Sequence, residues 1–273
     1  MRCNYVDITF ESTIMWIKFL KDFGNLHTFL LNYSILDCME TFSKGVHRAL
    51  VPLDPHIEGT IVVELVEASP GYRMLTQMDV LIFLRANGNE IKDVMSCSVA
   101  ELGAVNENIF ALTRNTKVIE AIRAMRTFAL VAVPVIAVEE DQGCGDEQLL
   151  QDGRGRRLID TFSATDLRGC SVAQLQSMLN VSVVEFKERV SAAASSTLLD
   201  ASKQKLITCY HDTELSKVID EAVMAHVHRV WVVDRQGLLM GLVSLTDILR
   251  VIREKAMTIM EELQEVAATE PTL

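Results

Sequence analysis

The chain has 273 residues, of which 49% are hydrophobic and 23% are charged, a composition typical of folded globular proteins. Its net charge of -11 argues against nucleic-acid binding, which requires clustered lysine and arginine. The six cysteines are scattered, with no CxxC and no Cys/His cluster at metal-ligand spacing. This pattern predicts reduced thiols, no metal site and a cytoplasmic or nuclear location.

The N-terminal residues are the part of the chain most compatible with a membrane contact. Residues 13–20 are very apolar, but Asp7 and Glu11 precede them and Lys18 interrupts them. No stretch reaches about 18 uncharged apolar residues, so no membrane span is expected. A signal peptide is not expected either, because the apolar run lacks a basic leader. We interpret residues 1–33 as a helical segment packed on the protein body, with a membrane-surface anchor as the alternative.

From residue 34 onward, three similar segments follow one another. In the first, the expected elements are a helix over 35–45 ended by Gly45, strands over 47–53 and 59–67, a short apolar stretch after Gly71, and a helix over 80–84. A basic pair, His47 and Arg48, opens the first strand, and Asp79 stands at the start of the last helix.

The same order returns twice. The middle segment has a helix over 118–125, a strand over 130–138 and a strand that leads to Asp166; the last has strands over 230–233 and 241–245, a tight turn at 236–237 and a helix from 248. In the last segment His228 and Arg229 form the basic pair, Thr246 is placed to cap the helix, and Asp247 lies in its first turn. Asp166 and Asp247 therefore correspond to Asp79. Three occurrences of one supersecondary unit indicate an internal repeat.

The connectors between these repeats are more polar. Residues 86–108 contain a helical patch over 99–102, and residues 169–204 contain a helix-like segment over 172–190 followed by a flexible surface stretch over 191–196. Residues 139–157 are acidic, then glycine-rich, then basic, which favours a solvated hairpin loop; a phosphate cradle is the alternative, although no glycine-rich phosphate motif is present. The residues from about 261 are charged and are expected to fray.

The repeats resemble CBS repeats, and most closely those of the gamma regulatory subunits of AMP-activated and sucrose-non-fermenting-related protein kinases, of the plant gamma-like type. The residues that carry the resemblance are 228–230 and 243–249 in the last repeat, 133–136 and 159–166 in the middle one, and 47–52 and 75–79 in the first. The resemblance implies an α/β fold of tandem βαββα units paired into a Bateman-type module. We expect an N-terminal segment over 1–33, repeats over 34–86, 105–170 and 205–258, and a tail over 259–273.

The resemblance also implies an adenine nucleotide bound between paired repeats. In such proteins an aspartate accepts the ribose hydroxyls, and the basic pair of the partner repeat meets the phosphates. Asp166, with Ser163 and Thr165, facing His228 and Arg229 would make one well-equipped site.

A second site would use Asp247 with Ser244 and Thr246. It lacks its phosphate partner, because Phe128 and Ala129 are assigned to the positions of the basic pair in the middle repeat. Gamma subunits have four repeats and this chain shows three.

The first repeat is therefore expected to be unpaired, which leaves His47, Arg48 and Asp79 as an orphan site without a recognisable partner. Residues 1–33 or a second copy of the chain, in a homodimer, would have to cover the open apolar face.

Each assignment has a structural competitor. The three aspartates can be first-turn carboxylates that stabilise helices, and His228 and Arg229 can be an exposed pair at a strand start. The function implied is that of a non-catalytic regulatory subunit that binds AMP, ADP or ATP as a regulatory ligand, needs no covalent cofactor and associates with kinase alpha and beta subunits. A nucleotide-independent scaffold is the alternative. An enzyme is disfavoured, because no nucleophile or metallohydrolase motif occurs.

Overall fold

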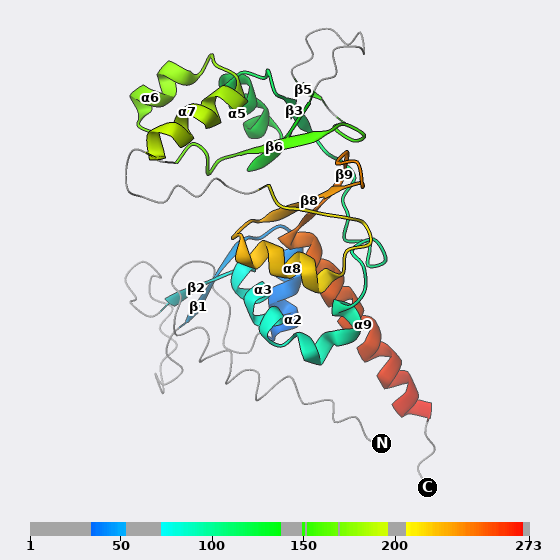
Figure 1. Ribbon diagram of the computed structural model, residues 1–273. Helices are drawn as coiled ribbons and strands as arrows, with labels where there is room; N and C mark the ends of the chain where they lie inside the picture. The colour runs from blue at the N-terminus through cyan, green and yellow to red at the C-terminus, as the bar shows by residue number, and fades with distance from the viewer. Residues whose placement is uncertain are drawn as a thin grey trace. The chain divides into compact units, whose positions relative to one another are not determined.

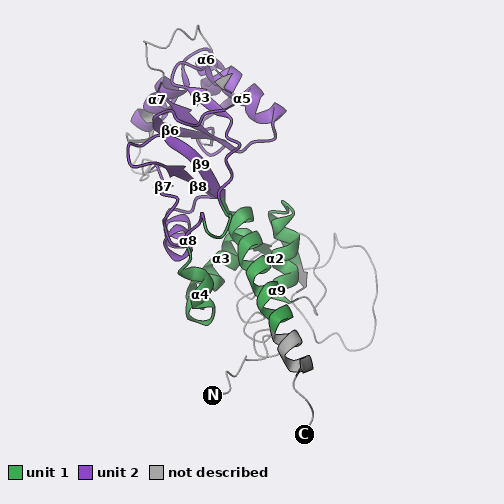
Figure 2. Cartoon of the chain, turned by 90° about the vertical axis from the view of Figure 1, so that its right-hand side faces the viewer, with its two compact units in different colours: residues 1–97, 101–104, 244–273 green, residues 98–100, 105–243 purple. Residues whose placement is uncertain are grey.

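A computed structural model of the chain describes residues 34–52, 72–137, 149–150, 152–168, 170–195 and 206–269 (Figure 1). The expected helix within 1–33, the expected strand over 59–67 and much of the loop over 139–157 lie outside these residues. The chain divides into two compact units (Figure 2). Unit 1 comprises Met1–Cys97, Glu101–Ala104 and Ser244–Leu273, and unit 2 comprises Ser98–Ala100 and Val105–Val243.

Unit 1 combines the first repeat with the last helix of the chain. Its elements are α2 (Ile35–Ser43), β1 (Arg48–Pro52), β2 (Tyr72–Thr76), α3 (Gln77–Ala86), the 3-10 helix η2 (Gly88–Ile91), α4 (Lys92–Met95) and α9 (Leu245–Thr269). The strands β1 and β2 pair antiparallel, with Arg48 opposite Thr76. Both α2 and α3 pack against α9 (Figure 2). The helices of the first repeat are therefore covered by α9. The expectation that the first repeat has no packing partner is wrong for these helices.

The helix α9 is longer than its sequence predicts. It continues to Thr269, so residues 259–269 are helical and not a frayed tail. Its start also differs from the prediction, because the side chain of Ser244, and not that of Thr246, accepts a hydrogen bond from the backbone N–H of Asp247. No helix in the described part of the chain is long and apolar enough to cross a membrane.

Unit 2 holds the middle repeat and most of the last one. Its elements are β3 (Ala111–Thr113), α5 (Val118–Thr127), β4 (Ala132–Ile136), β5 (Leu149–Leu150), β6 (Leu158–Ser163), α6 (Val172–Met178), α7 (Val183–Ser195), β7 (Thr208–Cys209), α8 (Leu215–Met224), β8 (Arg229–Val233) and β9 (Leu239–Ser244, which ends at the unit boundary). Two sheets form, with strand orders β5-β3-β4-β6 and β7-β8-β9. Between β8 and β9, Gly237 adopts φ +81°, which confirms the predicted turn at 236–237.

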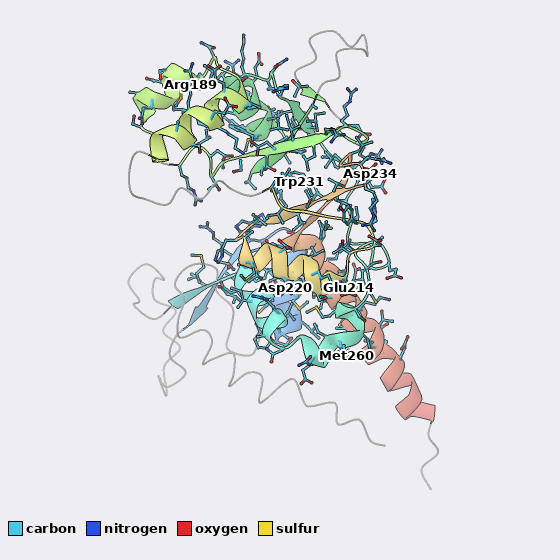
Figure 3. All side chains as sticks on the ribbon, in the orientation of Figure 1. Arg189, Glu214, Asp220, Trp231, Asp234 and Met260 are labelled. Atoms are coloured by element: carbon cyan, nitrogen blue, oxygen red, sulfur yellow. The ribbon has the colours of Figure 1, made fainter. Side chains whose placement is uncertain are left out.

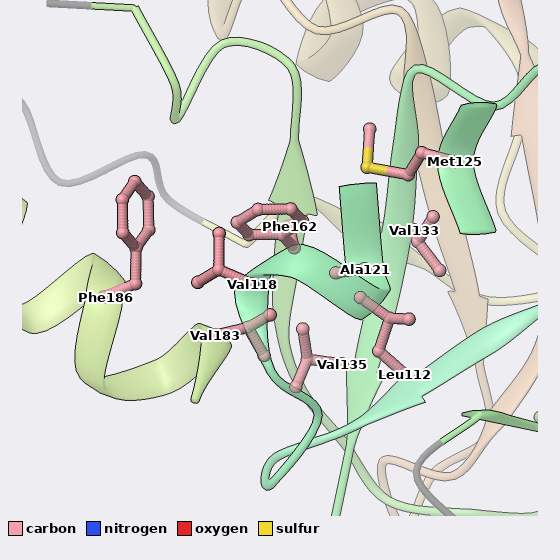
Figure 4. Packing of buried hydrophobic residues seen from close by; sticks show 9 residues of the cluster. All are labelled: Leu112, Val118, Ala121, Met125, Val133, Val135, Phe162, Val183 and Phe186. Carbon is pink, nitrogen blue, oxygen red and sulfur yellow. The ribbon is translucent and has the colours of Figure 1, made fainter. Parts of the chain in front are cut away.

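The connector after the middle repeat is part of its core. On α7, Val183 and Phe186 are fully buried, and the Phe186 ring packs edge-on against Phe162 of β6 at 6.0 Å between centroids (Figure 4). The backbone N–H groups of Val118 and Ile119, which the first turn of α5 leaves without helical partners, donate to carbonyls of the α6–α7 link. Because α7 extends to Ser195, the expected flexible stretch from residue 191 is helical at its start.

The two sheets of unit 2 share a second apolar cluster. Trp231 and Val233 of β8 pack with Ile136, Leu158 and other buried residues. The indole N–H of Trp231 donates to Thr161 Oγ1 of β6 at 2.6 Å, which satisfies the polar end of a side chain that is only 3% exposed. The middle and last repeats are therefore held together by a packed interface.

The segment over 98–104 is a series of turns and not the predicted helix. Val99 is fully buried, and its backbone N–H donates to the carbonyl of Thr213 at 3.0 Å. The apolar residues in this segment anchor a connection rather than one face of a helix.

Candidate functional site

The three aspartates of the repeats share one local geometry. Oδ2 of Asp79, Asp166 and Asp247 accepts hydrogen bonds from both the backbone N–H and the side-chain hydroxyl of the residue three positions earlier. Those residues are Thr76, Ser163 and Ser244. The three segments of the predicted internal repeat thus share one hydrogen-bond arrangement.

This Ser/Thr-x-x-Asp arrangement is by itself a helix cap. It also occurs between Ser34 and Asp37 at the start of α2, away from any repeat strand. At Asp79 and Asp247 it opens α3 and α9, as a capping box does. At these positions helix stabilisation alone accounts for the carboxylate.

Asp166 differs from the other two because no helix follows it. Residues 164–168 are turns, and α6 begins only at Val172 with a capping box of its own between Ser171 and Gln174. The alternative interpretation of Asp166 as a first-turn carboxylate that stabilises a helix is therefore wrong. Its carboxylate is half-buried, and helix stabilisation does not account for it.

Arg229 is connected to this aspartate through one strand pair. Its Nη1 donates to the carbonyl oxygen of Ala132 at 2.7 Å, and Ala132 on β4 pairs with Ser163 on β6. Ser163 in turn holds Asp166. Of the sequence-predicted set, Ser163, Asp166 and Arg229 are therefore brought to one edge of the β4–β6 pair.

The environment of Arg229 is suited to an anion. Burial lowers the pKa of its guanidinium from the ordinary value, because desolvation disfavours the charged form. No described carboxylate lies within ion-pair distance of Arg229. Among the described residues, its other N–H groups are not among the buried polar atoms that lack a hydrogen-bond partner. His228, just before β8 begins, and Thr165, just after β6 ends, are both exposed.

The helix ends that precede the repeat strands establish the register between repeats. Gly45, Ala129 and His226 each adopt a positive φ, of 91°, 52° and 51°, two residues after α2, α5 and α8 end. Such left-handed residues close helix C-termini. In each repeat the strand begins three residues later, at Arg48, Ala132 and Arg229.

This register corrects the sequence alignment of the middle repeat. Val131 and Ala132, and not Phe128 and Ala129, occupy the positions of the basic pair. The conclusion that the middle repeat lacks this pair is unchanged. Val131 is 54% exposed and Phe128 is 51% exposed, so the position presents apolar surface.

In unit 1, a buried amide engages two of the predicted ligand residues. Gln77, only 2% exposed, donates from Nε2 to Thr246 Oγ1 at 2.9 Å and to the Phe42 carbonyl at 3.1 Å. Its Oε1 lies 3.0 Å from His47 Nδ1. Sequence reasoning missed Gln77, although it is the polar residue at a position where the other repeats have Ala164 and Leu245.

Comparison with protein families supports the assignment of the last predicted repeat. A family model described as the CBS domain matches residues 198–254. This stretch of the chain is similar to a CBS domain. The match falls on the last CBS repeat, whose sequence motif is the most specific of the three.

Relatives of known name extend the likeness over most of the chain. It is 44% identical over 233 residues to the Arabidopsis thaliana protein named SNF1-related protein kinase regulatory subunit gamma-like PV42a, covering 84% of this chain and 63% of the plant protein. It is 26% identical over 234 residues to the 5'-AMP-activated protein kinase subunit gamma of Kluyveromyces lactis, covering 85% of this chain and 60% of the yeast protein. The chain thus spans less than two thirds of either relative. The predicted resemblance to kinase gamma subunits is confirmed, and the plant relative is named as a regulatory subunit.

A solved structure agrees with the fold. The chain superposes on protein MJ1225 of Methanocaldococcus jannaschii with a TM-score of 0.55 at 18% identity, covering 84% of this chain and 67% of the archaeal protein. At this identity the match supports the fold alone. The predicted α/β fold class is confirmed.

Proposed function

We propose that this protein is a non-catalytic regulatory subunit of a protein kinase complex. We further propose that it binds AMP, ADP or ATP between its middle and last CBS repeats. The named relatives support the regulatory role, since they are gamma or gamma-like subunits of such kinases. By the same analogy the partners are kinase alpha and beta subunits, in the cytoplasm or nucleus. The observation that supports the site is Asp166, a Ser-x-x-Asp carboxylate without a helix to cap, which is connected through Ser163 and Ala132 to the half-buried Arg229.

In this proposal Arg229 binds the phosphates. A half-buried guanidinium with no carboxylate partner among the described residues gains more from an anion than an exposed one, because less water screens the interaction. Its bond to the Ala132 carbonyl fixes the side chain in advance, which lowers the entropy lost on binding. His228, exposed at the same strand start, adds a second donor.

Asp166 binds the ribose. Its Oδ2 is occupied by Ser163, while Oδ1 accepts no hydrogen bond from a described residue. A carboxylate oxygen fixed in this way can accept the ribose hydroxyls, which are donors. Ser163 thus orients the carboxylate, and Thr165 lies beside it.

Isothermal titration calorimetry with AMP, ADP and ATP tests the site. A hydrogen bond to a charged group contributes about 1.5–3 kcal/mol, so Asp166→Asn and Arg229→Gln should each weaken binding about ten-fold or more. Asp247→Asn is the matched control, because it alters the same Ser-x-x-Asp arrangement at a helix start. Absence of binding to the wild type at millimolar nucleotide, or equal losses for Asp166→Asn and Asp247→Asn, would contradict the proposal.

A nucleotide-independent scaffold is the second candidate, and two observations favour it for the Asp247 site. Thr246 already accepts a hydrogen bond from Gln77, and the middle repeat has Val131 and Ala132 in place of a basic pair. If the scaffold reading holds, alpha and beta subunits should co-purify with the chain to the same extent with and without AMP. A change in their affinity on adding AMP would count against it.

A further inference from the structure

The apolar stripe of α9 continues beyond the part of the helix that unit 1 covers. Ile248, Leu249 and Ile252 are buried against the helices of the first repeat. At helical spacing the stripe goes on through Ala256, Ile259 and Met260, but none of these is buried, and Met260 is 43% exposed (Figure 3). A helix face of this kind fits a partner surface.

The orientation of α2 explains where its packing against α9 ends. Phe42, near the end of α2, is joined through Gln77 to Thr246 at the start of α9. Glu40 forms an ion pair with Arg253, later in α9, at 2.6 Å. The two helices therefore run antiparallel. The first residue of α2, Ile35, lies five residues before Glu40, so α2 begins on the side of Glu40 that faces the later residues of α9, beyond Arg253.

The chain that precedes α2 consequently enters unit 1 beside the uncovered stripe. Residues 13–20 are the apolar run within 1–33. They are separated from Ser34 by residues 21–33, a length that spans up to about 40 Å when extended, whereas α9 beyond Arg253 is only about 24 Å long. A tethered segment of this kind has an effective concentration in the millimolar range.

Charge also matches between the two segments. Lys18 and Lys21 lie in and after the apolar run, and Glu261 and Glu262 are exposed on α9 next to Met260. Two copies of α9 packed in parallel would instead bring these carboxylates together. We propose that residues 13–20 dock on the α9 stripe formed by Ala256, Ile259 and Met260, and so complete the cover of unit 1 within one chain.

Tryptophan fluorescence of the full chain tests this docking. The chain has two tryptophans, Trp16 and Trp231, so the difference between the wild type and Trp16→Phe isolates Trp16. We expect Trp16 to emit at short wavelength and to resist acrylamide quenching. Met260→Lys should shift this emission to longer wavelength and raise the quenching constant several-fold. Val172→Lys is the control, because Val172 is 74% exposed on α6 of unit 2 and its replacement should leave Trp16 unchanged.

Several outcomes would overturn the proposal. One is a Trp16 that is freely quenched in the wild type, and another is a Trp16 that is equally protected in Met260→Lys. Protection that grows with protein concentration would assign the stripe to a second copy of the chain, and protection that requires anionic lipid vesicles would assign the segment to a membrane surface. The emission of buried Trp231 verifies that each variant is folded.

Discussion

Replacing Gln77 by leucine removes the buried amide that joins α2, the His47 side chain and α9 while keeping a similar side-chain volume. Three hydrogen bonds are lost, to Thr246, to the Phe42 carbonyl and with His47. Each neutral bond contributes about 0.5–1.5 kcal/mol net. The partners are not all stranded, because the Phe42 carbonyl also accepts from Gly45 N, and His47 is exposed to water.

Three such bonds together contribute about 1.5–4.5 kcal/mol. Because the partners are not all left unpaired, we expect Gln77→Leu to lower the free energy of unfolding of unit 1 by about 2–3 kcal/mol, in the lower half of that range. Urea denaturation followed by circular dichroism measures it, with the transitions of the two units fitted separately. Thr246→Val is the partner variant. A double-mutant cycle should give a coupling energy of about 0.5–1.5 kcal/mol between the two residues.

The reasoning is refuted if Gln77→Leu is as stable as the wild type, or if the coupling energy to Thr246 is zero. Either result would mean that apolar packing and the Glu40–Arg253 ion pair hold α9 on the first repeat without a contribution from Gln77. Thr246 would then be available to a ligand, and the Asp247 site would have to be reconsidered as a second nucleotide site.

Two further predictions concern the cores. Phe186→Ala should destabilise unit 2 by about 3–5 kcal/mol, because Phe186 is fully buried against Phe162; thermal unfolding measures it, and a loss no larger than that of an exposed control such as Val172→Ala would show that α7 is not part of this core. Burial raises the pKa of Cys38 and of Cys209 from 9.0 to about 12. The folded state therefore holds these protons more tightly, and stability should be constant below about pH 9 and fall by up to about 1.4 kcal/mol per pH unit per thiol between pH 9 and 12. Urea titrations of the wild type and of Cys38→Ala and Cys209→Ala measure this slope, and an unchanged slope in both variants would contradict the assignment.

The candidate site was partly predictable. Asp166 and Arg229 could be identified because they occupy positions that recur in the repeats. Such a pattern depends only on residues that are close together in the sequence. The hydrogen bond from Arg229 to Ala132 could not be predicted, since it joins residues far apart in sequence. The register error at Phe128 has a specific cause. Ala129 adopts the same left-handed backbone conformation as Gly45. Glycine commonly marks this conformation in a sequence, whereas alanine does not, so the end of α5 could not be located from the sequence.

The sequence by itself determined the three repeats, the strands β1, β4, β8 and β9, and the Ser/Thr-x-x-Asp boxes, because apolar periodicity and capping chemistry act over a few residues. The tertiary structure decided what each box does. The box at Asp247 begins a helix that packs on the first repeat, whereas the chain turns away after Asp166 and α7 fills the middle core instead. That choice depends on which buried faces meet, Phe186 on Phe162 and α9 on α2, and contacts between distant segments are not encoded in the pattern of any one of them.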